Sequence, residues 1–486
     1  MTVHGRTRRI LGVLLGIAVL LAVLVVAVAL WPTRTRSIAG TPLPAAGTPE
    51  LARLVEAGRY VATASDCVAC HSGDRGAPFT GGLPLAAPIG TLYSTNITPD
   101  VETGIGRYTL DEFDRVIRHG IARDGRTLYP AMPYPSYARL SDADLRALYA
   151  YFLHGGVAPV RQANRANDIP WPLSMRWPVA LWRKALGGSL DAPTDYAARH
   201  GGATEVARGA YLVQSAGHCG ACHTARAITL QEKGLDETSA DYLAGGQIVD
   251  GWVAVNLRGD PADGLGRWTT DDIVRTLRGA RNRNHAVVGG AMQDVVVHST
   301  QHLVDADLQA IAAYLKTLPA SRSPATTYAP DERTARALES GRADGRGAEV
   351  YVDNCAACHR TNGLGHADAF PTLAGNPSVL APDPTSLIRV VLAGSSLPGI
   401  PTAPSPLGMP SFAWRLSDAE TAAVVTFVRQ GFGNTAPAAT AAEVARVRAE
   451  LARQQARMDE ERRHAGTATA AHEASGRRTA GPPEKR

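Results

Sequence analysis

The sequence predicts a mainly α-helical chain of three tandem domains that follow one N-terminal transmembrane helix. The chain has 486 residues, which at about 150 residues per domain allows roughly three domains. One plan of helices around a Cys-x-x-Cys-His motif occurs three times along it, the pattern of a tandem array. Residues 10–31 form an uninterrupted apolar run of the length that crosses a bilayer.

The apolar run is the first element. As a helix it would be about 33 Å long. The basic residues Arg6, Arg8 and Arg9 precede it and favour a cytoplasmic N-terminus, although Arg34 and Arg36 beyond it weaken this bias. A cleaved signal peptide is the alternative, but its apolar core usually has only about 7 to 15 residues. We expect a cytoplasmic N-terminus at 1–9, a retained anchor at 10–31, and the three domains after it exported to the periplasmic side of a bacterial inner membrane.

All six cysteines belong to the three pentads, so none is left for a disulfide or a free thiol. The spacing is that of c-type haem attachment, in which two thiols bind one porphyrin and the adjacent histidine binds its iron. We therefore predict three covalently bound haem c groups. The attachment cysteines are Cys67 and Cys70, Cys219 and Cys222, and Cys355 and Cys358, and the iron ligands are His71, His223 and His359.

Two other readings of these cysteines are weaker. A structural zinc site usually needs two Cys-x-x-Cys pairs close together, whereas Cys67, Cys219 and Cys355 are 152 (219 − 67) and 136 (355 − 219) residues apart. A redox disulfide within each pair leaves the adjacent histidines unexplained.

The helices around each pentad follow one order. The helix that leads into it carries a glycine eight to ten residues before the first cysteine, at Gly58, Gly209 and Gly347. A second helix ends on glycine, at 111–120, 271–279 and 385–394. The last helix begins at an acidic residue and carries an aromatic residue nine positions later, at Tyr151, Tyr314 and Phe427. We expect the glycine to let this aromatic residue approach, so that the first and last helices cross closely.

Each repeat also offers a sixth iron ligand. A loop between the second and last helices carries one methionine, Met132, Met292 or Met409, beside proline or glycine. A thioether ligand favours ferrous iron. His119, His285, His298 and His302 are rival ligands, but none recurs at one place in all three repeats.

The remaining segments separate the domains. Tryptophan and proline are concentrated at 168–186, which we expect to strap across a domain surface or to dock a partner, because exposed tryptophan is costly to solvate. The expected boundaries are a linker at 32–48, domains at 49–160, 201–319 and 336–434, a connector at 161–200, a linker at 320–335, and a charged, partly disordered tail at 435–486. In this tail Val444, Val447 and Leu451 form one helical stripe, and the last twenty or so residues have the composition of a disordered segment.

Charge and ligation limit the function. The formal net charge of +5 is spread along the chain and is too mild to indicate a nucleic-acid partner. If all three irons are six-coordinate, no open site remains, and the chain relays electrons and is not catalytic alone. Two alternatives stay open: a multihaem peroxidase or nitrite-type reductase with one open iron, and the haem subunit of a terminal oxidase.

Several stretches outside the pentads resemble one known family, over about residues 58–434. They are NITPD at 96–100, TGIG at 103–106, LYPAMPY at 128–134, YLK at 314–316 and FPTLAGN at 370–376. In them the chain resembles the triheme membrane-bound cytochrome c subunit of the quinone-linked alcohol, gluconate, sorbitol and aldehyde dehydrogenases of acetic acid bacteria and related proteobacteria.

This resemblance implies three class I cytochrome c-like domains with His/Met ligation: His71 with Met132, His223 with Met292, and His359 with Met409. It also implies that the carbonyl of Pro371 supports His359, while the second repeat has no matching proline. The implied partners are a catalytic dehydrogenase subunit with a quinone, flavin or molybdenum cofactor, and ubiquinone or a terminal oxidase as the acceptor.

Overall fold

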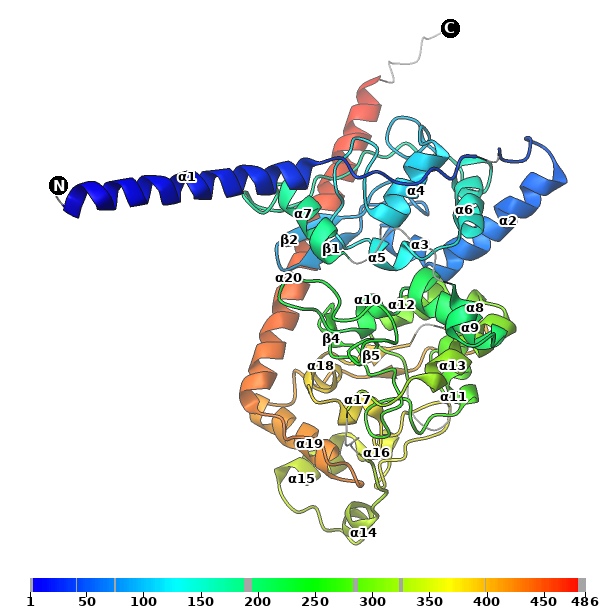
Figure 1. Ribbon diagram of the computed structural model, residues 1–486. Helices are drawn as coiled ribbons and strands as arrows, with labels where there is room; N and C mark the ends of the chain where they lie inside the picture. Colours follow the sequence, from blue (N-terminus) through cyan, green and yellow to red (C-terminus); the bar gives the residue numbers. More distant parts are fainter. Residues whose placement is uncertain are drawn as a thin grey trace. The chain divides into compact units, whose positions relative to one another are not determined.

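Helices dominate the chain in the computed structural model, which describes residues 3–40, 42–73, 76–187, 195–282, 287–322, 327–397 and 399–479 (Figure 1). The chain forms two compact units. Unit 1 comprises Met1–Asp250, Ala254–Thr327 and Pro398–Ser405, and unit 2 comprises Gly251–Val253, Tyr328–Leu397 and Pro406–Arg486. The first two expected domains thus lie in one unit, and the division into three domains stays a prediction.

The N-terminal helix α1 covers Val3–Leu30. Within it, Ile10–Leu30 is long and apolar enough to cross a membrane, and the side chains of this stretch are almost all exposed. This is the helix that the apolar run predicts.

The first repeat has the expected helices in the expected order. A hairpin of β1 and β2 follows the cysteines, with Pro84 opposite Tyr93. The elements are α2 (Pro49–Ala64), α3 (Cys67–Cys70), β1 (Pro84–Ala87), β2 (Gly90–Tyr93), α4 (Leu110–His119), α5 (Tyr134–Tyr137) and α6 (Asp142–Leu153).

The tryptophan-rich connector straps across this repeat. Asp168 pairs with Thr91 of β2 through both backbone hydrogen bonds, and Asn167 Oδ1 accepts a hydrogen bond from the N–H of Tyr93. The hydroxyl of Tyr129 donates to the carbonyl of Leu173 at 3.1 Å. The connector then forms α7 (Trp177–Leu186) and, after a gap, α8 (Tyr196–Arg199). The strap that the sequence predicts is therefore present.

The second repeat completes unit 1. One difference concerns Met292, which the sequence places in a loop but which begins a helix. The elements are α9 (Thr204–Tyr211), η1 (Leu212–Ala216), α10 (Gly220–His223), β3 (Ile248–Val249), α11 (Thr270–Gly279), α12 (Met292–His298), η2 (Thr300–His302) and α13 (Asp305–Thr317).

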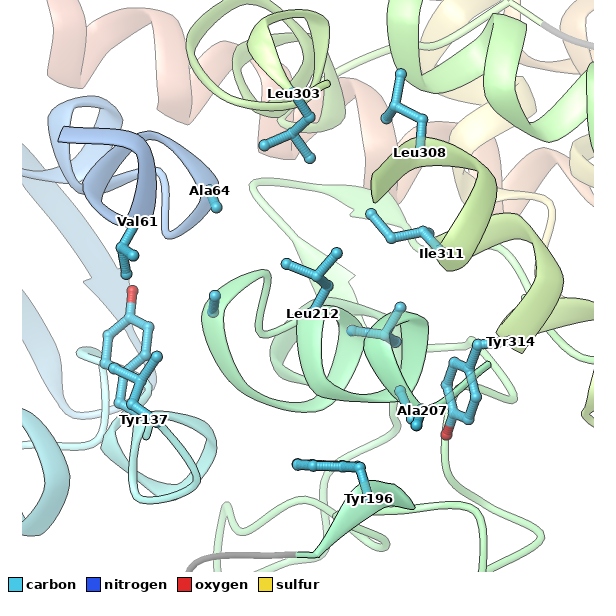
Figure 2. Packing of buried hydrophobic residues seen from close by; sticks show 14 of the residues in the cluster. Val61, Ala64, Tyr137, Tyr196, Ala207, Leu212, Leu303, Leu308, Ile311 and Tyr314 are labelled. Atoms are coloured by element: carbon cyan, nitrogen blue, oxygen red, sulfur yellow. The ribbon is translucent and has the colours of Figure 1, made fainter. Parts of the chain in front are cut away.

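One large hydrophobic core cluster joins the two repeats of unit 1. Figure 2 shows Leu212 of η1 lying between Val61 and Tyr137 of the first repeat and Ile311 of α13. Asp307 strengthens this junction, because its carboxylate accepts hydrogen bonds from Tyr60 of the first repeat (2.7 Å) and from Arg208 of the second (2.7 and 2.8 Å).

Unit 2 contains the third repeat and a long C-terminal helix. The carbonyls of Val379, Ala381 and Pro437 accept hydrogen bonds from the fully buried guanidinium of Arg429, which fastens the last helix of the repeat. The elements are β4 (Trp252–Val253), α14 (Arg333–Glu339), α15 (Arg346–Asn354), α16 (Ala356–His359), α17 (Pro377–Leu380), α18 (Thr385–Ala393), β5 (Ser395–Ser396), β6 (Gly408–Met409), α19 (Asp418–Gln430) and α20 (Ala441–Thr479).

The C-terminal helix differs in part from the expected tail. Val444 and Val447 of α20 are fully buried and Leu451 packs beside them, as the stripe predicts. The composition predicts a disordered end, whereas the helix continues to Thr479. Residues 480–486 lie outside the described part of the chain.

The close helix crossing is confirmed in all three repeats. A methyl group at Gly58 would lie 1.9 Å from the carbonyl oxygen of Ala147, and one at Gly209 would lie 1.9 Å from that of Ala310. At Gly347 the corresponding distance is 2.4 Å, to Ala423. In each case the next nearest residue is the predicted aromatic one, whose Cβ would lie 2.7–2.9 Å from the methyl group. Only glycine fits these three positions.

The ends of the second helices vary. Helix α4 ends as expected, with Gly120 in the left-handed conformation at φ 60°. In the second repeat Gly279 is the last helical residue, and the left-handed position is Ala280 at φ 57°. In the third repeat Gly394 follows α18 with φ 75°.

Candidate haem sites

The three pentads share one backbone geometry. The N–H of the histidine donates to the carbonyl of the first cysteine in each, at 3.0 Å for His71, 2.9 Å for His223 and 2.9 Å for His359. Such a bond closes one helical turn. Both thiols and the imidazole therefore stand on one turn, which is the arrangement that haem attachment needs.

Each histidine ring is fixed by a backbone carbonyl. The Nδ1 atom of His71 lies 2.7 Å from the carbonyl oxygen of Thr95, that of His223 lies 2.8 Å from Val255, and that of His359 lies 3.0 Å from Pro371. Because a carbonyl only accepts, Nδ1 carries the proton and Nε2 keeps its lone pair. The support of His359 by Pro371 is confirmed.

Burial sets the protonation of these groups. It lowers the pKa of all three histidines, which keeps the imidazole neutral, the form that binds a metal. Burial also raises the pKa of Cys67, Cys219 and Cys355 to about 12. With Nε2 free at every site and two cysteines on the same turn, the residues fit a covalently bound haem c.

The predicted methionines lie against apolar cores to different degrees. Met132 and Cys67 pack against one core cluster, and Met409 and Cys355 pack against another. Met292 packs instead against a smaller cluster that contains Val288 and Val296. All three are partly buried. The structure therefore brings cysteine and methionine to a common core in the first and third repeats but not in the second.

The rival histidines have other surroundings. His119 is buried near the end of α4, and His302 Nε2 lies 3.0 Å from the carbonyl of Val297. His298 ends α12. His285 lies outside the described residues. Within the described ranges, no three His, Cys, Asp or Glu side chains form a group that could hold a metal ion.

The first two pentads are linked through residues that the sequence analysis missed. The carbonyl of Ser65, two residues before Cys67, accepts a hydrogen bond from the Tyr137 hydroxyl at 3.0 Å and lies 3.3 Å from Nε2 of His218. The rings of Tyr137 and His218 meet edge to face, with centroids 5.5 Å apart. Since His218 directly precedes Cys219, one backbone carbonyl connects the starts of both haem motifs.

Comparison with known proteins places this arrangement in a family. The family model described as "Cytochrome c" matches residues 206–319 and 345–431, and the model described as "Cytochrome C oxidase, cbb3-type, subunit III" matches residues 53–152. The gluconate 2-dehydrogenase cytochrome c subunit of Pantoea cypripedii is 55% identical over 399 residues, which cover 81% of this chain and 89% of that protein. The chain belongs to the family of dehydrogenase cytochrome c subunits.

Two further members show how wide this family is. The cytochrome c subunit of the quinone alcohol dehydrogenase of Komagataeibacter europaeus is 51% identical over 415 residues, 85% of this chain and 87% of that protein. The fructose dehydrogenase cytochrome subunit of Gluconobacter japonicus is 35% identical over 438 residues, 86% of each. The oxidase model covers one repeat, whereas these subunits match nearly the whole chain, so the relatives favour the dehydrogenase reading over the terminal oxidase.

Within this dehydrogenase cytochrome c subunit, a buried carboxyl group lies beside the first pentad. Asp66 adopts a left-handed conformation at φ 50° and is 8% exposed. Burial, together with the carboxylate of Asp294 on α12, raises the pKa of Asp66 to about 8. Helix α12 packs against α3 here, so the helix that Met292 begins lies beside the turn that carries the cysteines of the other repeat.

The segment that carries Met409 is held from both sides. Met409 pairs with Ser395 across β5 and β6, and the N–H of Phe412 donates to Val391 at 3.0 Å. Arg448 of α20 then donates to the carbonyls of Ala413 and Leu416, each at 2.9 Å, and bonds Asp418 at 2.8 Å. The C-terminal helix therefore fixes the backbone just after the predicted iron ligand.

Proposed function

We propose that this chain is the three-haem electron-transfer subunit of a membrane dehydrogenase complex. It accepts single electrons from a catalytic subunit and passes them to ubiquinone or a terminal oxidase. The observation that carries the proposal is the repeated site: three pentads, each on one helical turn, each with its histidine Nδ1 on a backbone carbonyl. When bound, haem c supplies a one-electron iron couple.

The methionines give these sites their proposed role. Met132, Met292 and Met409 would complete the coordination of His71, His223 and His359, respectively. A closed coordination shell leaves no position for oxygen, peroxide or nitrite, which is the reason to favour transfer over catalysis. Each methionine is partly buried, as a ligand directed into the protein needs to be.

Contacts beside the first two pentads support a relay. Helix α3 of the first repeat and α12 of the second lie against each other, and Ser65 and His218 join the starts of the two motifs. Both attachment sites belong to unit 1 and share its core, so their separation is fixed by packing. An electron can therefore pass between them without diffusion of either site.

The location follows from the N-terminal helix and the chemistry of haem attachment. Ile10–Leu30 serves as a retained anchor in the inner membrane, with both units on the periplasmic side. The catalytic partner is a dehydrogenase subunit of the kind named for the relatives, with gluconate, an alcohol or fructose as the class of substrate.

The test replaces one methionine at a time in the full chain: Met132→Leu, Met292→Leu and Met409→Leu. Each variant should lose one third of the low-spin haem signal and gain one site that binds carbon monoxide when reduced. Met175→Leu, in the connector and also partly buried, is the matched control and should leave all spectra unchanged. Unaltered spectra in all three ligand variants would refute the ligand assignment, and strong carbon monoxide binding by the unmodified protein would favour a peroxidase or reductase.

A further inference from the structure

The connector exposes large apolar side chains. Trp171 is 79% exposed and Leu173 is 50% exposed, in the turn that precedes α7. Trp31, which follows α1 directly, is 73% exposed. Tryptophan buries a large surface when it is covered and is enriched where protein meets the membrane interface, because its ring is apolar and its N–H is polar.

The turn is fixed to unit 1 and does not hang free. Tyr129 donates its hydroxyl hydrogen to the carbonyl of Leu173, and the guanidinium of Arg176 stacks 4.1 Å above the Tyr129 ring. The backbone therefore bonds to the protein while Trp171 and Leu173 point outward. A strap with no second role would need no apolar side chains on its outer side.

Helix α7, which follows the turn, is bonded to the end of the proposed membrane anchor. The ammonium group of Lys184 donates to the carbonyls of Val28 (2.6 Å), Ala29 (3.2 Å) and Trp31 (2.5 Å). Helix α1 has no basic residue in its own last turn, so Lys184 caps it from another element. Ala29 is only 3% exposed, and Arg183 bonds the hydroxyl of Thr33 just beyond. The end of α1 and α7 lie side by side (Figure 1).

This contact sets the level of α7 relative to a bilayer. The 21 residues Ile10–Leu30 span about 31 Å as a helix, close to the thickness of the hydrocarbon core, so the last turn of α1 ends at its boundary. Whatever bonds that turn lies at the headgroup level. Lys184 is suited to this level, since its ammonium group stays polar while its stem is apolar. Trp171 is six positions before Trp177, where α7 begins.

We propose that the turn with Trp171 and Leu173 is a second membrane contact, which inserts into the interface of the lipid bilayer beside the end of α1. It gives unit 1 a second point of attachment besides the anchor. Two points of attachment prevent unit 1 from rotating about α1 and thereby fix the orientation of its first haem site relative to the membrane. The inference rests on the proposed role of α1 as a retained anchor.

The experiment uses photo-crosslinking in the full chain, with haem attached, reconstituted into vesicles of phosphatidylethanolamine and phosphatidylglycerol. Benzoylphenylalanine replaces one residue at a time: Trp171, Leu173, Leu20 in the anchor (68% exposed), or Trp414 in unit 2 (80% exposed). After irradiation, mass spectrometry measures lipid adducts on each peptide. We expect adducts at positions 20, 171 and 173, with yields at 171 and 173 at least about tenfold above that at 414.

The controls separate the two claims. Adducts at 20 but none at 171 and 173 would overturn the second contact and leave the anchor intact. No adducts at 20 would overturn the anchor and the inference with it. Equal yields at 171, 173 and 414 would also overturn the inference, because an equally exposed tryptophan elsewhere would then meet lipid as often. In Lys184→Met, which keeps the apolar stem and has no N–H donor, the yield at 173 should fall severalfold, since the hydrogen bonds from α7 to the end of α1 are lost.

Discussion

Alanine at the three crossing glycines should destabilise the protein in a graded way. A contact below 3.0 Å is essentially never seen for a real Cβ atom, so the helices must move apart at each substitution. The required movement is about 1.1 Å at Gly58 and Gly209 (3.0 − 1.9) and about 0.6 Å at Gly347 (3.0 − 2.4). In each case the methyl group would clash with a backbone carbonyl, which cannot move away by a rotamer change as a side chain can.

The magnitude is the difference between two effects. Overpacking of a tight interface costs about 1–3 kcal/mol and occasionally more, whereas alanine gains about 1 kcal/mol over glycine within a helix. We expect Gly58→Ala and Gly209→Ala to lose about 2 kcal/mol net, and Gly347→Ala about 1 kcal/mol or less. In a cooperative unit of about 150–250 residues, 2 kcal/mol corresponds to a Tm lower by about 4–8 °C. Unit 1 is larger, so we expect a decrease near the lower end of this range.

Thermal unfolding of the full chain, followed by far-ultraviolet circular dichroism and by haem absorbance, measures the effect. Gly40→Ala is the control, because a methyl group there meets nothing within 4 Å. If Gly58→Ala and Gly209→Ala melt within about 1 °C of Gly40→Ala, the helices do not cross at glycine and the reasoning is wrong.

Three further predictions concern individual polar contacts. Asp307→Asn should lower the free energy of unfolding of unit 1, measured by guanidinium titration, by about 1–3 kcal/mol. The control Asp305→Asn lies on the same helix and has an 87% exposed side chain, so it should change this free energy by less than about 1 kcal/mol. Hydrogen bonds from Arg346 and Ser417 hold the pKa of Glu420 at about 2, so this carboxylate stabilises the fold above the unfolded pKa of about 4.3. The loss of unfolding free energy in Glu420→Gln should therefore vanish as the pH falls from about 5 to about 2. A loss that does not depend on pH would contradict this. Arg448→Ala should lower the temperature at which one haem loses its methionine-to-iron charge-transfer band. Arg448→Lys should have an intermediate effect, and Arg453→Ala, at an exposed position of the same helix, should have none. If Arg448→Ala does not shift the transition, α20 does not support the Met409 segment.

Local features with a side-chain signature could be predicted from the sequence. The Gly58, Gly209 and Gly347 crossings recur eight to ten residues before the first cysteine of each pentad, and recurrence distinguishes a packing requirement from a flexible glycine. The buried stripe of α20 was visible because Val444 and Val447 are apolar at helical spacing. These predictions succeeded because the residue type itself indicates the environment: glycine a close helix crossing, and spaced valines a buried helix face.

Features carried by the backbone or by distant partners could not be predicted. The carbonyls of Thr95 and Val255 support two histidines, but every residue has a carbonyl, so no letter in the sequence marks them. The left-handed turn after α11 falls on Ala280, one position past the glycine that predicted it. The shared core of unit 1 depends on packing between residues far apart in the chain, which no local pattern encodes.

That shared core has a consequence for biogenesis. The hydroxyl of Tyr60 donates to Asp307, which lies 247 residues further along the chain. Val61 packs in the same core as Ile311, which belongs to the same helix as Asp307. During synthesis the first repeat therefore cannot complete this packing until almost all of the second repeat has been made. Until then the helix that leads into Cys67 and Cys70 lacks part of the packing that buries it in the complete chain. The order of synthesis and the order of final folding are thus separated.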